Sequence, residues 1–269
     1  MEQTIVITGS TRGLGFGLAE AFLERGHRVV INGTTQEGTA EALKKLVRFG
    51  TRVYGVAGDV RMRAAVEHLC VSAAQQFGSV DIWVNNAGID HAGQFVADLD
   101  PRRVEAVVDV NLNGVISGTV VAFLLMKQQG RGKIFNMEGL GSDGFMMNGM
   151  TIYGTTKRAV SYFTRSFAHE IQGSGVMVGT LSPGMVVTDM LRRTVCDGSP
   201  ESLKRQRFYN SMADDVETVA SFLCSRMLIA SGKEFQKIQW LTKLKIFLRM
   251  LSAPFKRRSF FQDSLPDTL

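Results

Sequence analysis

Cysteine and proline are scarce in this sequence, and no uninterrupted apolar run is long. Among 269 residues there are five prolines and three cysteines, Cys70, Cys196 and Cys224. The cysteines are too few and too scattered for a disulfide framework or a metal-ligand set, so we expect free thiols in a reducing compartment and no metal site. A helix that spans a bilayer needs roughly 20 apolar residues, and no stretch approaches that length. Residues 4–8 already have the pattern of a buried strand, so we expect no signal peptide, no transmembrane helix and a cytoplasmic location.

An excess of positive over negative charge is absent everywhere except near the C-terminus. The net charge is +6, and residues 231–261 hold eight lysines and arginines against one acid, Glu234. Since the net positive charge of this segment exceeds that of the whole chain, the net charge of the remaining residues is slightly negative. The distribution excludes a nucleic-acid-binding surface over the whole domain and indicates a local partner for the basic segment.

Short β-branched runs alternate with longer amphipathic stretches. Six runs have the composition of strands, at residues 4–8, 28–32, 52–57, 82–85, 133–137 and 177–182. Several are apolar throughout, as in strands covered on both faces, and the alternation predicts right-handed βαβ crossovers. We therefore predict an α/β fold with a Rossmann-type, doubly wound parallel sheet. It would form a single domain over residues 1–230, followed by a basic amphipathic C-terminal extension over residues 231–269 that is too short for its own core.

A glycine-rich turn directly follows the first predicted strand. Residues 8–15 read Thr-Gly-Ser-Thr-Arg-Gly-Leu-Gly, and an apolar-periodic helix follows. Glycines at such a turn let the backbone approach a pyrophosphate, whose charge is met by exposed amides and the positive end of the helix. The alternative is a tight turn that needs positive φ. The predicted dinucleotide contacts are Gly9, Ser10, Thr11, Arg12, Gly13, Leu14 and Gly15.

The end of the second predicted strand indicates which dinucleotide binds. A free ribose 2′-hydroxyl is usually held by an acid about twenty residues past the glycines, but residues 31–35 read Ile-Asn-Gly-Thr-Thr. Arg12 lies inside the glycine turn, where a guanidinium could bind a 2′-phosphate through two hydrogen bonds. Gly33 would give room, and the hydroxyls of Thr34 and Thr35 would add donors. We therefore predict NADP(H); the alternative is a merely solvated Arg12.

Two further segments follow predicted strands. Asp59 and Val60 come after the third strand, where Asp59 is placed to bond the adenine edge, and Asn86, Ala87 and Gly88 come after the fourth. Each segment alone has the composition of an ordinary turn or cap. In this order, after the glycine turn, they predict the remaining wall of a nucleotide site.

Tyr153 and Lys157 stand four residues apart, so on a helix they share a face about one turn apart. A phenol with a pKa of about 10 is a weak acid at neutral pH, and an adjacent lysine cation should lower that pKa. Tyr153 would then protonate a carbonyl oxygen as hydride arrives at its carbon, and Lys157 would also hold the nicotinamide ribose. The same spacing occurs in surface pairs, but its position in a chain with a nucleotide turn favours catalysis.

The motifs Thr-Gly-x-x-x-Gly-x-Gly, Asp-Val, Asn-Asn-Ala-Gly and Tyr-x-x-x-Lys occur in the order that is typical of one family. Together they resemble the short-chain dehydrogenase/reductase family over residues 4–190. The resemblance implies that Asn111 holds a water linking Lys157 to solvent, with a purely structural asparagine as the alternative. It also implies that a loop with Pro183, Gly184 and Thr188 orients the nicotinamide carboxamide.

One position departs from the family pattern. The serine that polarises the carbonyl normally lies thirteen residues before the tyrosine, where this chain has Leu140, and the usual Ser-Ser reads Glu138-Gly139. Losing one donor near the developing negative charge costs about 10² to 10³ in rate. Either Ser142 reaches the site, helped by its flexible glycine neighbours, or the site works with Tyr153 alone.

The same departure points to one branch of the family. The Met-Glu-Gly run at 137–139 resembles the chlorophyll(ide) b reductase branch. That resemblance implies NADPH-dependent reduction of the 7-formyl group of chlorophyll(ide) b to 7-hydroxymethyl chlorophyll(ide) a, and a stromal location. A reductase or dehydrogenase of another hydrophobic ketone, steroid or acyl substrate would keep all the motifs. A non-catalytic NADP(H)-binding sensor would explain the missing serines.

The C-terminal segment and a methionine group complete the predictions about partners. From residue 238 to 261, apolar residues recur at helical spacings among lysines and arginines, as in a helix at an anionic membrane interface. Packing on the protein's own core or on a partner subunit is the alternative. Met146, Met147 and Met150 would form an adaptable apolar wall near Tyr153. We expect a hydrophobic carbonyl substrate, peripheral membrane contact through this segment, and a homo-oligomer.

Overall fold

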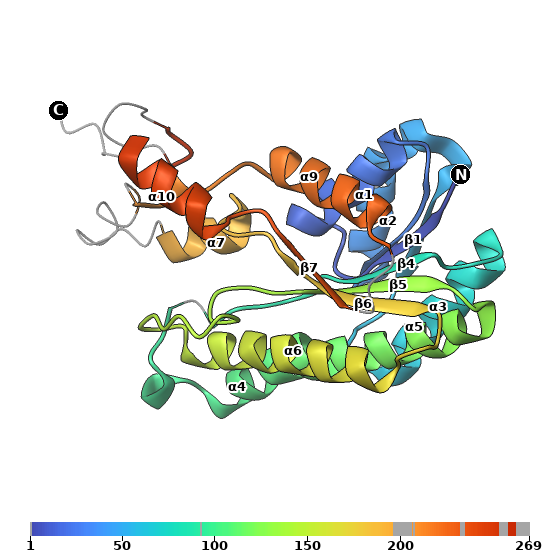
Figure 1. The fold of residues 1–269 in the computed structure, drawn as a ribbon, viewed down its shortest axis with the longest axis horizontal. Coiled ribbons are helices and arrows are strands. Elements are labelled where there is room, and N and C mark those ends of the chain that lie inside the picture. Colours follow the sequence, from blue (N-terminus) through green and yellow to red (C-terminus); the bar gives the residue numbers. More distant parts are fainter. Residues whose placement is uncertain are drawn as a thin grey trace.

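The fold is built on a parallel sheet that has helices on both faces (Figure 1). The computed structural model describes residues 2–91, 93–195, 206, 208–231, 235–252 and 258–261. The seven strands lie in the order β3-β2-β1-β4-β5-β6-β7, and each neighbouring pair is parallel. They are β1 (Thr4–Ile7), β2 (Arg28–Gly33), β3 (Val53–Ala57), β4 (Ile82–Asn85), β5 (Gly132–Met137), β6 (Val176–Ser182) and β7 (Phe235–Gln239).

The helices fall into two layers, one on each face of this sheet (Figure 1). Helices α1 and α9 pack against each other on one face, whereas α3 and α5 pack against each other on the other. The helices are α1 (Gly13–Glu24), α2 (Gln36–Lys45), α3 (Arg63–Phe77), α4 (Pro101–Val108), α5 (Gly114–Gln129), α6 (Thr151–Glu170), α7 (Asp189–Val195), α9 (Val216–Ile229) and α10 (Lys243–Ser252). The predicted Rossmann-type α/β fold is confirmed.

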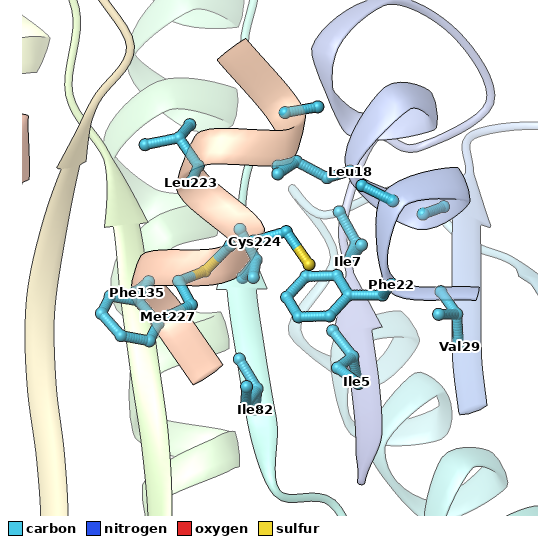
Figure 2. Close-up of a cluster of buried hydrophobic side chains, with 14 of the residues drawn as sticks. Ile5, Ile7, Leu18, Phe22, Val29, Ile82, Phe135, Leu223, Cys224 and Met227 are labelled. Atoms are coloured by element: carbon cyan, nitrogen blue, oxygen red, sulfur yellow. The ribbon is translucent and has the colours of Figure 1, made fainter. Parts of the chain in front are cut away.

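Strand β1 shows why the strand sequences are apolar throughout. Ile5 and Ile7 pack into the layer of α1 and α9, whereas Val6 between them packs into the opposite layer. Figure 2 shows the first of these clusters, in which Phe22 of α1 and Leu223 of α9 lie over the sheet. Since both faces are buried, alternation between apolar and polar residues would leave polar groups in the core.

The order of the strands places the site. The chain runs outward from β1 through β2 to β3 and then returns to pair β4 with the other side of β1. In doubly wound sheets, ligands bind beyond the carboxyl ends of the strands where the order reverses. Here that point is between β1 and β4, where the glycine turn and Asn86–Gly88 follow their strands.

The C-terminal part of the sheet differs from the expectation. Strand β7 lies inside the segment 231–269, which the sequence predicts to be an extension, and it pairs with β6 from Val178↔Phe235 to Ser182↔Gln239. The sheet therefore continues beyond residue 230. The sequence of β7, Phe-Gln-Lys-Ile-Gln, is mostly polar because β7 is an edge strand with a partner strand on one side only. Residues 232–234, 253–257 and 262–269 of the predicted extension lie outside the described residues.

One helical stretch has the length and composition of a possible membrane span, which by itself is weak evidence that it crosses a membrane. It runs from Pro101 to Gln129 and comprises α4, a π-helical turn (Asp109–Asn113) and α5. The sequence breaks the apolar pattern at Asn111 and Asn113, but the backbone stays helical across the turn. Helix α5 packs against β4, β5 and α3, which is the position of a core helix in this fold.

Candidate active site

The glycine turn brings the backbone of β1, α1 and the segment after β4 into close contact. Gly9 has a φ of 60°, and a Cβ atom on it would lie 2.7 Å from Cα of Ala87. A Cβ atom on Gly15 would lie 2.6 Å from the carbonyl oxygen of Gly9. The side-chain amide of Asn86 donates to the carbonyl oxygens of Thr8 and Gly9, both at 2.9 Å. These contacts leave no room for side chains at Gly9 and Gly15, both of which line the cavity.

The start of α1 is suited to an anion. Its first residue is Gly13, and the preceding Arg12 is extended. Among the described residues, no side chain caps this terminus, and the first turn contains no acid. The amide groups of a first helical turn carry partial positive charge and have no partner within the helix, so a phosphate is a favourable ligand there.

The carboxyl end of β2 is uncharged. Asn32 is buried, and its amide group donates to the carbonyl oxygens of Val56 and Gly58 at 3.1 and 3.0 Å. A Cβ atom on Gly33 would lie 2.9 Å from the Thr39 hydroxyl, so a residue with a side chain would not fit here unless its neighbours moved. Arg12 is exposed and lines the same cavity as Gly33 and Thr34.

Three predicted cofactor residues have structural contacts in the described part of the chain. Ser10 is buried, and its hydroxyl donates to the carbonyl of Ile7 at 2.7 Å and accepts from the Asn32 amide. Thr35 caps α2 by accepting from the Gly38 amide. Neither lines the cavity. Asp59 lines it, but its carboxylate binds Arg61 at 2.6 to 2.9 Å, and this hydrogen bond lowers the pKa of Asp59.

Helix α6 carries Tyr153 and Lys157 on the face toward the sheet. Lys157 is buried, and its Nζ donates to the carbonyl of Met137, the last residue of β5, at 3.1 Å. The same Nζ lies 5.6 Å from the centre of the Tyr153 ring. The predicted pairing of the two side chains across one helical turn is therefore present in the structure.

The charge state of this pair differs from the expectation. Burial raises the pKa of Tyr153, and the carboxylate of Asp90 acts in the same direction. The sequence reading expected Lys157 to lower that pKa. Burial also lowers the pKa of Lys157 to about 8, although the carboxylate of Glu138 opposes this shift. A half-buried phenol with a raised pKa stays protonated at neutral pH, which is the state of a proton donor.

Ser142 lies outside the cavity lining, contrary to its expected role as a substitute donor. Its hydroxyl accepts from the amide of Gly139 at 3.0 Å and donates to the carbonyl of the same residue. The hydroxyl therefore closes the turn after β5. Leu140 does line the cavity, so an apolar side chain is found where the family pattern has its serine.

Glu138 is the unusual charged group of the site. It lines the cavity, and its side chain is only 1% exposed. One carboxylate oxygen lies 2.8 Å from Nζ of Lys237 on β7, and neither oxygen has a hydrogen bond from a described residue. Sequence reasoning offered two readings of Glu138, orientation of a polar substrate or a solvated cap. The carboxylate is buried beside Lys237, which excludes a solvated cap, whereas orientation of a polar substrate stays a prediction.

Asn111 lies in the π-helical turn and is fully buried. Its side chain accepts from the amide of Ile89 and donates to the carbonyl of the same residue, both at 2.8 Å. It does not line the cavity, but Gly88 separates it from Lys157: a Cβ atom on Gly88 would lie 3.4 Å from Oδ1 of Asn111 and 3.7 Å from Nζ of Lys157. The expected water-holding role stays a prediction.

A single cavity of about 560 Å³ joins the two ends of the site. Its nucleotide end is lined by predicted residues, namely Gly9, Thr11, Arg12, Gly13, Leu14, Gly15, Gly33, Thr34, Asp59, Val60, Asn86, Ala87 and Gly88. Its other end contains Tyr153 and Lys157, together with the predicted Pro183, Gly184 and Thr188. The remaining wall is largely apolar and rich in methionine, with Met137, Met147, Met150, Met185 and Met190. Met146 of the predicted methionine wall is exposed instead.

Several lining residues, among them Asp90, Arg103 and Tyr209, are not among the residues that the sequence predicts. Asp90 lies in the segment after β4 and its charge acts on Tyr153, and Arg103 of α4 donates to the carbonyl oxygen of Asp90. Tyr209 reaches the cavity from a segment between α7 and α9. No short motif marks these positions, because they come together only through the path of the loops.

The comparisons with known proteins agree with this geometry. Residues 3–197 match the model of the family described as short chain dehydrogenase. The chain belongs to this family. The predicted resemblance is thereby confirmed, and a parallel sheet of the same kind is found in a solved structure titled KRED1-Pglu enzyme, with a TM-score of 0.76 and 26% identity over 88% of this chain and all of that one.

Curated relatives narrow the similarity to one branch. The chain is 35% identical to a probable chloroplastic chlorophyll(ide) b reductase of Oryza sativa subsp. japonica, over 97% of this chain and 54% of that protein. It is also 35% identical to a chloroplastic chlorophyll(ide) b reductase of Arabidopsis thaliana, over 92% of this chain and 72% of that protein. The predicted resemblance to this branch is confirmed. The chain spans about half the length of the first of these relatives.

Proposed function

We propose that this chain is an NADPH-dependent carbonyl reductase that reduces the 7-formyl group of chlorophyll(ide) b to 7-hydroxymethyl chlorophyll(ide) a. The observation that carries the proposal is the single cavity in which the glycine turn and the Tyr153–Lys157 pair face the same space. Similarity to chlorophyll(ide) b reductases supports the substrate, and the methionine-rich wall supports a large apolar one.

The residues of the nucleotide end fit a dinucleotide phosphate. Gly9, Gly13 and Gly15 leave a cradle that a side chain would fill, and the uncapped start of α1 faces it. Arg12 would bind the 2′-phosphate beside the uncharged end of β2, which supports NADPH over NADH. When bound, NADPH would supply the hydride.

Tyr153 would donate the proton to the carbonyl oxygen. Its raised pKa keeps the phenol protonated before the proton is transferred. Lys157 would place a positive charge beside the phenolate that forms, and Asn111 would support proton return to Lys157. Pro183, Gly184 and Thr188 would orient the nicotinamide, and Val60, Thr34 and the Asn86–Gly88 segment would line the rest of the dinucleotide site.

Two other functions remain as alternatives. Similarity to a 3α-hydroxysteroid dehydrogenase of Mediterraneibacter gnavus (32% identical over 70% of this chain and 76% of that protein) favours a reductase of another hydrophobic substrate. The apolar Leu140 and the glycine at 139 favour a non-catalytic NADP(H)-binding sensor, because the site lacks the usual serine. A cytoplasmic or stromal location, a homo-oligomer and contact with a membrane are further parts of the proposal.

A turnover assay separates these functions. The protein would be mixed with NADPH or NADH and a panel of chlorophyll b, chlorophyllide b, a 3-ketosteroid and an acetoacetyl thioester, and the products would be identified by chromatography. The proposal predicts a 7-hydroxymethyl pigment with NADPH. Turnover of the steroid or thioester alone would favour the broader reductase, and binding of NADPH without turnover of any substrate would favour the sensor.

A further inference from the structure

Helix α10 is attached to the domain through its basic face. Arg249 donates to the carboxylate of Asp214 at 2.7 and 2.9 Å and to the carbonyl of Met212 at 2.6 Å. Lys245, one turn earlier, places its Nζ over the indole ring of Trp240. Asp214 is buried and also binds Trp240 and Arg258. Lys245 and Arg249 therefore point toward the protein, whereas Lys243 at the start of the helix is exposed.

The opposite face of α10 is apolar and exposed. Leu244, Phe247, Leu248 and Leu251 are 66%, 57%, 54% and 58% exposed. Their spacing of three, four and seven residues places them on one stripe of the helix. Helices of a globular domain normally turn such a stripe toward the core. Here the orientation is reversed for α10, so these four residues do not pack on the protein's own core, whereas Ile238, Leu241 and Phe261 of the same predicted segment are buried in it.

Charge around this helix indicates the kind of partner. Helix α10 contains Lys243, Lys245 and Arg249 and no acid. A single buried carboxylate, Asp214, faces three cationic side chains, and burial together with Arg249 lowers the pKa of Lys245 to about 8. Lys245 and Arg249 contact the protein, so the cation that α10 presents to solvent beside the stripe is the exposed Lys243. An exposed apolar helix face next to a lysine, on a helix without acids, is typical of binding at an anionic lipid interface.

A second copy of the chain fits this surface less well. In a symmetric dimer the same patch is present on both subunits, so α10 would face α10 and its lysines would face one another. Like charges across an interface oppose association. An anionic bilayer instead neutralises the exposed Lys243 while it takes up the apolar stripe.

Helix α10 is also connected to the cavity wall. The amide of Asp214 donates to the carbonyl of Met185, and the amide of Val187 donates to the carbonyl of Asp214, both at 2.9 Å. Met185 and Val186 line the cavity. Figure 1 shows α10 at the end of the molecule where α7, another part of the cavity wall, is found. Two backbone hydrogen bonds therefore connect Asp214, which binds α10, to the cavity wall at the substrate end of the site.

We propose that α10 is an interfacial helix that docks the protein on an anionic lipid surface through Leu244, Phe247, Leu248 and Leu251. Docking would hold the cavity wall at Met185–Val187 close to the lipid, from which an apolar substrate would enter. Only this last step rests on the proposed function. Lipid binding itself requires no turnover, so its failure and a failure of reductase activity are distinguishable.

Vesicle sedimentation tests the proposal. The full chain would be incubated with vesicles of phosphatidylglycerol and phosphatidylcholine, and with vesicles of phosphatidylcholine alone, at low and high salt. We expect binding to the anionic vesicles that weakens as salt increases, because exposed charges are screened. Phe247→Ser combined with Leu251→Ser should weaken binding at least about tenfold, since both changes remove apolar area from the interface.

A matched variant controls for the loss of apolar surface. Val71→Ser combined with Ile229→Ser removes two exposed apolar side chains from α3 and α9, and it should bind vesicles like the unchanged protein. Circular dichroism would confirm that both double variants fold. No binding to anionic vesicles at low salt, equal binding by the α10 variant, or a dimer in sedimentation that the α10 variant abolishes would each overturn the proposal.

Discussion

Gly139 packs directly against the phenol of Tyr153. A Cβ atom on Gly139 would overlap the phenolic oxygen, and it would lie 3.1 Å from two ring carbons. The position of Tyr153 therefore requires glycine at position 139, directly after Glu138. This contact explains why position 139 lacks the serine of the usual pair: a side chain at 139 and Tyr153 in its present position exclude each other.

Adding a side chain at this position should disrupt the site. Gly139→Ser would displace the phenol, and we expect kcat to fall at least about tenfold even though the change restores a hydroxyl, because small displacements of a reacting group carry large costs. Gly154→Ala is the matched control, since its Cβ would have an ordinary contact distance of 3.7 Å. Faster turnover by Gly139→Ser would show that the site lacks a donor and has room for one.

The role of Ser142 can be separated from catalysis. Ser142→Ala would leave the buried amide of Gly139 without its acceptor, which should lower the free energy of unfolding by about 1 to 3 kcal/mol. Urea denaturation would measure this loss, and kcat should change less than tenfold. Unchanged stability with a hundredfold loss in kcat would instead show that the Ser142 hydroxyl takes part in the reaction.

Cofactor preference should depend on Arg12. Arg12→Ala would remove charge-assisted hydrogen bonds to a 2′-phosphate, so NADPH should bind about 10 to 100 times more weakly while NADH binding stays nearly unchanged. Fluorescence titration with both nucleotides would measure this. Arg48→Ala serves as the control, because Arg48 pairs with Glu20 and Glu24 and does not line the cavity. Equal affinity of the unchanged protein for both nucleotides would contradict an NADPH-specific site.

The pH dependence of the reaction should depend on Glu138. Lys157 has a pKa of about 8, so it is charged below that pH and loses its charge as pH rises. The Glu138 carboxylate favours the charged form, so Glu138→Gln should lower the pKa of Lys157 further and move the alkaline limb of kcat to lower pH. Glu138→Asp should restore part of the shift. A lower kcat with an unmoved alkaline limb would assign Glu138 a structural role only.

Local motifs were predictable from the sequence, and loop-dependent positions were not. The glycine turn and the spacing of Tyr153 and Lys157 each depend on one strand or helix, so their residue pattern is sufficient. The hydrogen bonds of Ser142 depend on the loop after β5, where Gly141 and Gly144 have positive φ, and no pattern fixes that path. Strand β7 was missed because a short edge strand with alternating polar residues resembles a tail.

The charge state of the site was also beyond the sequence. Spacing alone indicated that Lys157 would lower the pKa of Tyr153, but the sequence does not show how deeply each group is buried or that Asp90 faces the phenol. Desolvation dominates at both residues. In the same way, the apolar stripe of α10 was visible as a pattern, whereas its outward orientation depends on Arg249 and Asp214.

The central claim is that Tyr153 donates the proton in an NADPH-dependent carbonyl reduction. The most direct test is Tyr153→Phe, with NADPH affinity and the rate of NADPH oxidation by chlorophyll b measured on the same preparation. The account predicts nearly unchanged NADPH binding and a rate below about a tenth of the original, because only the donor is removed. A variant that keeps more than about a tenth of the rate would contradict the claim.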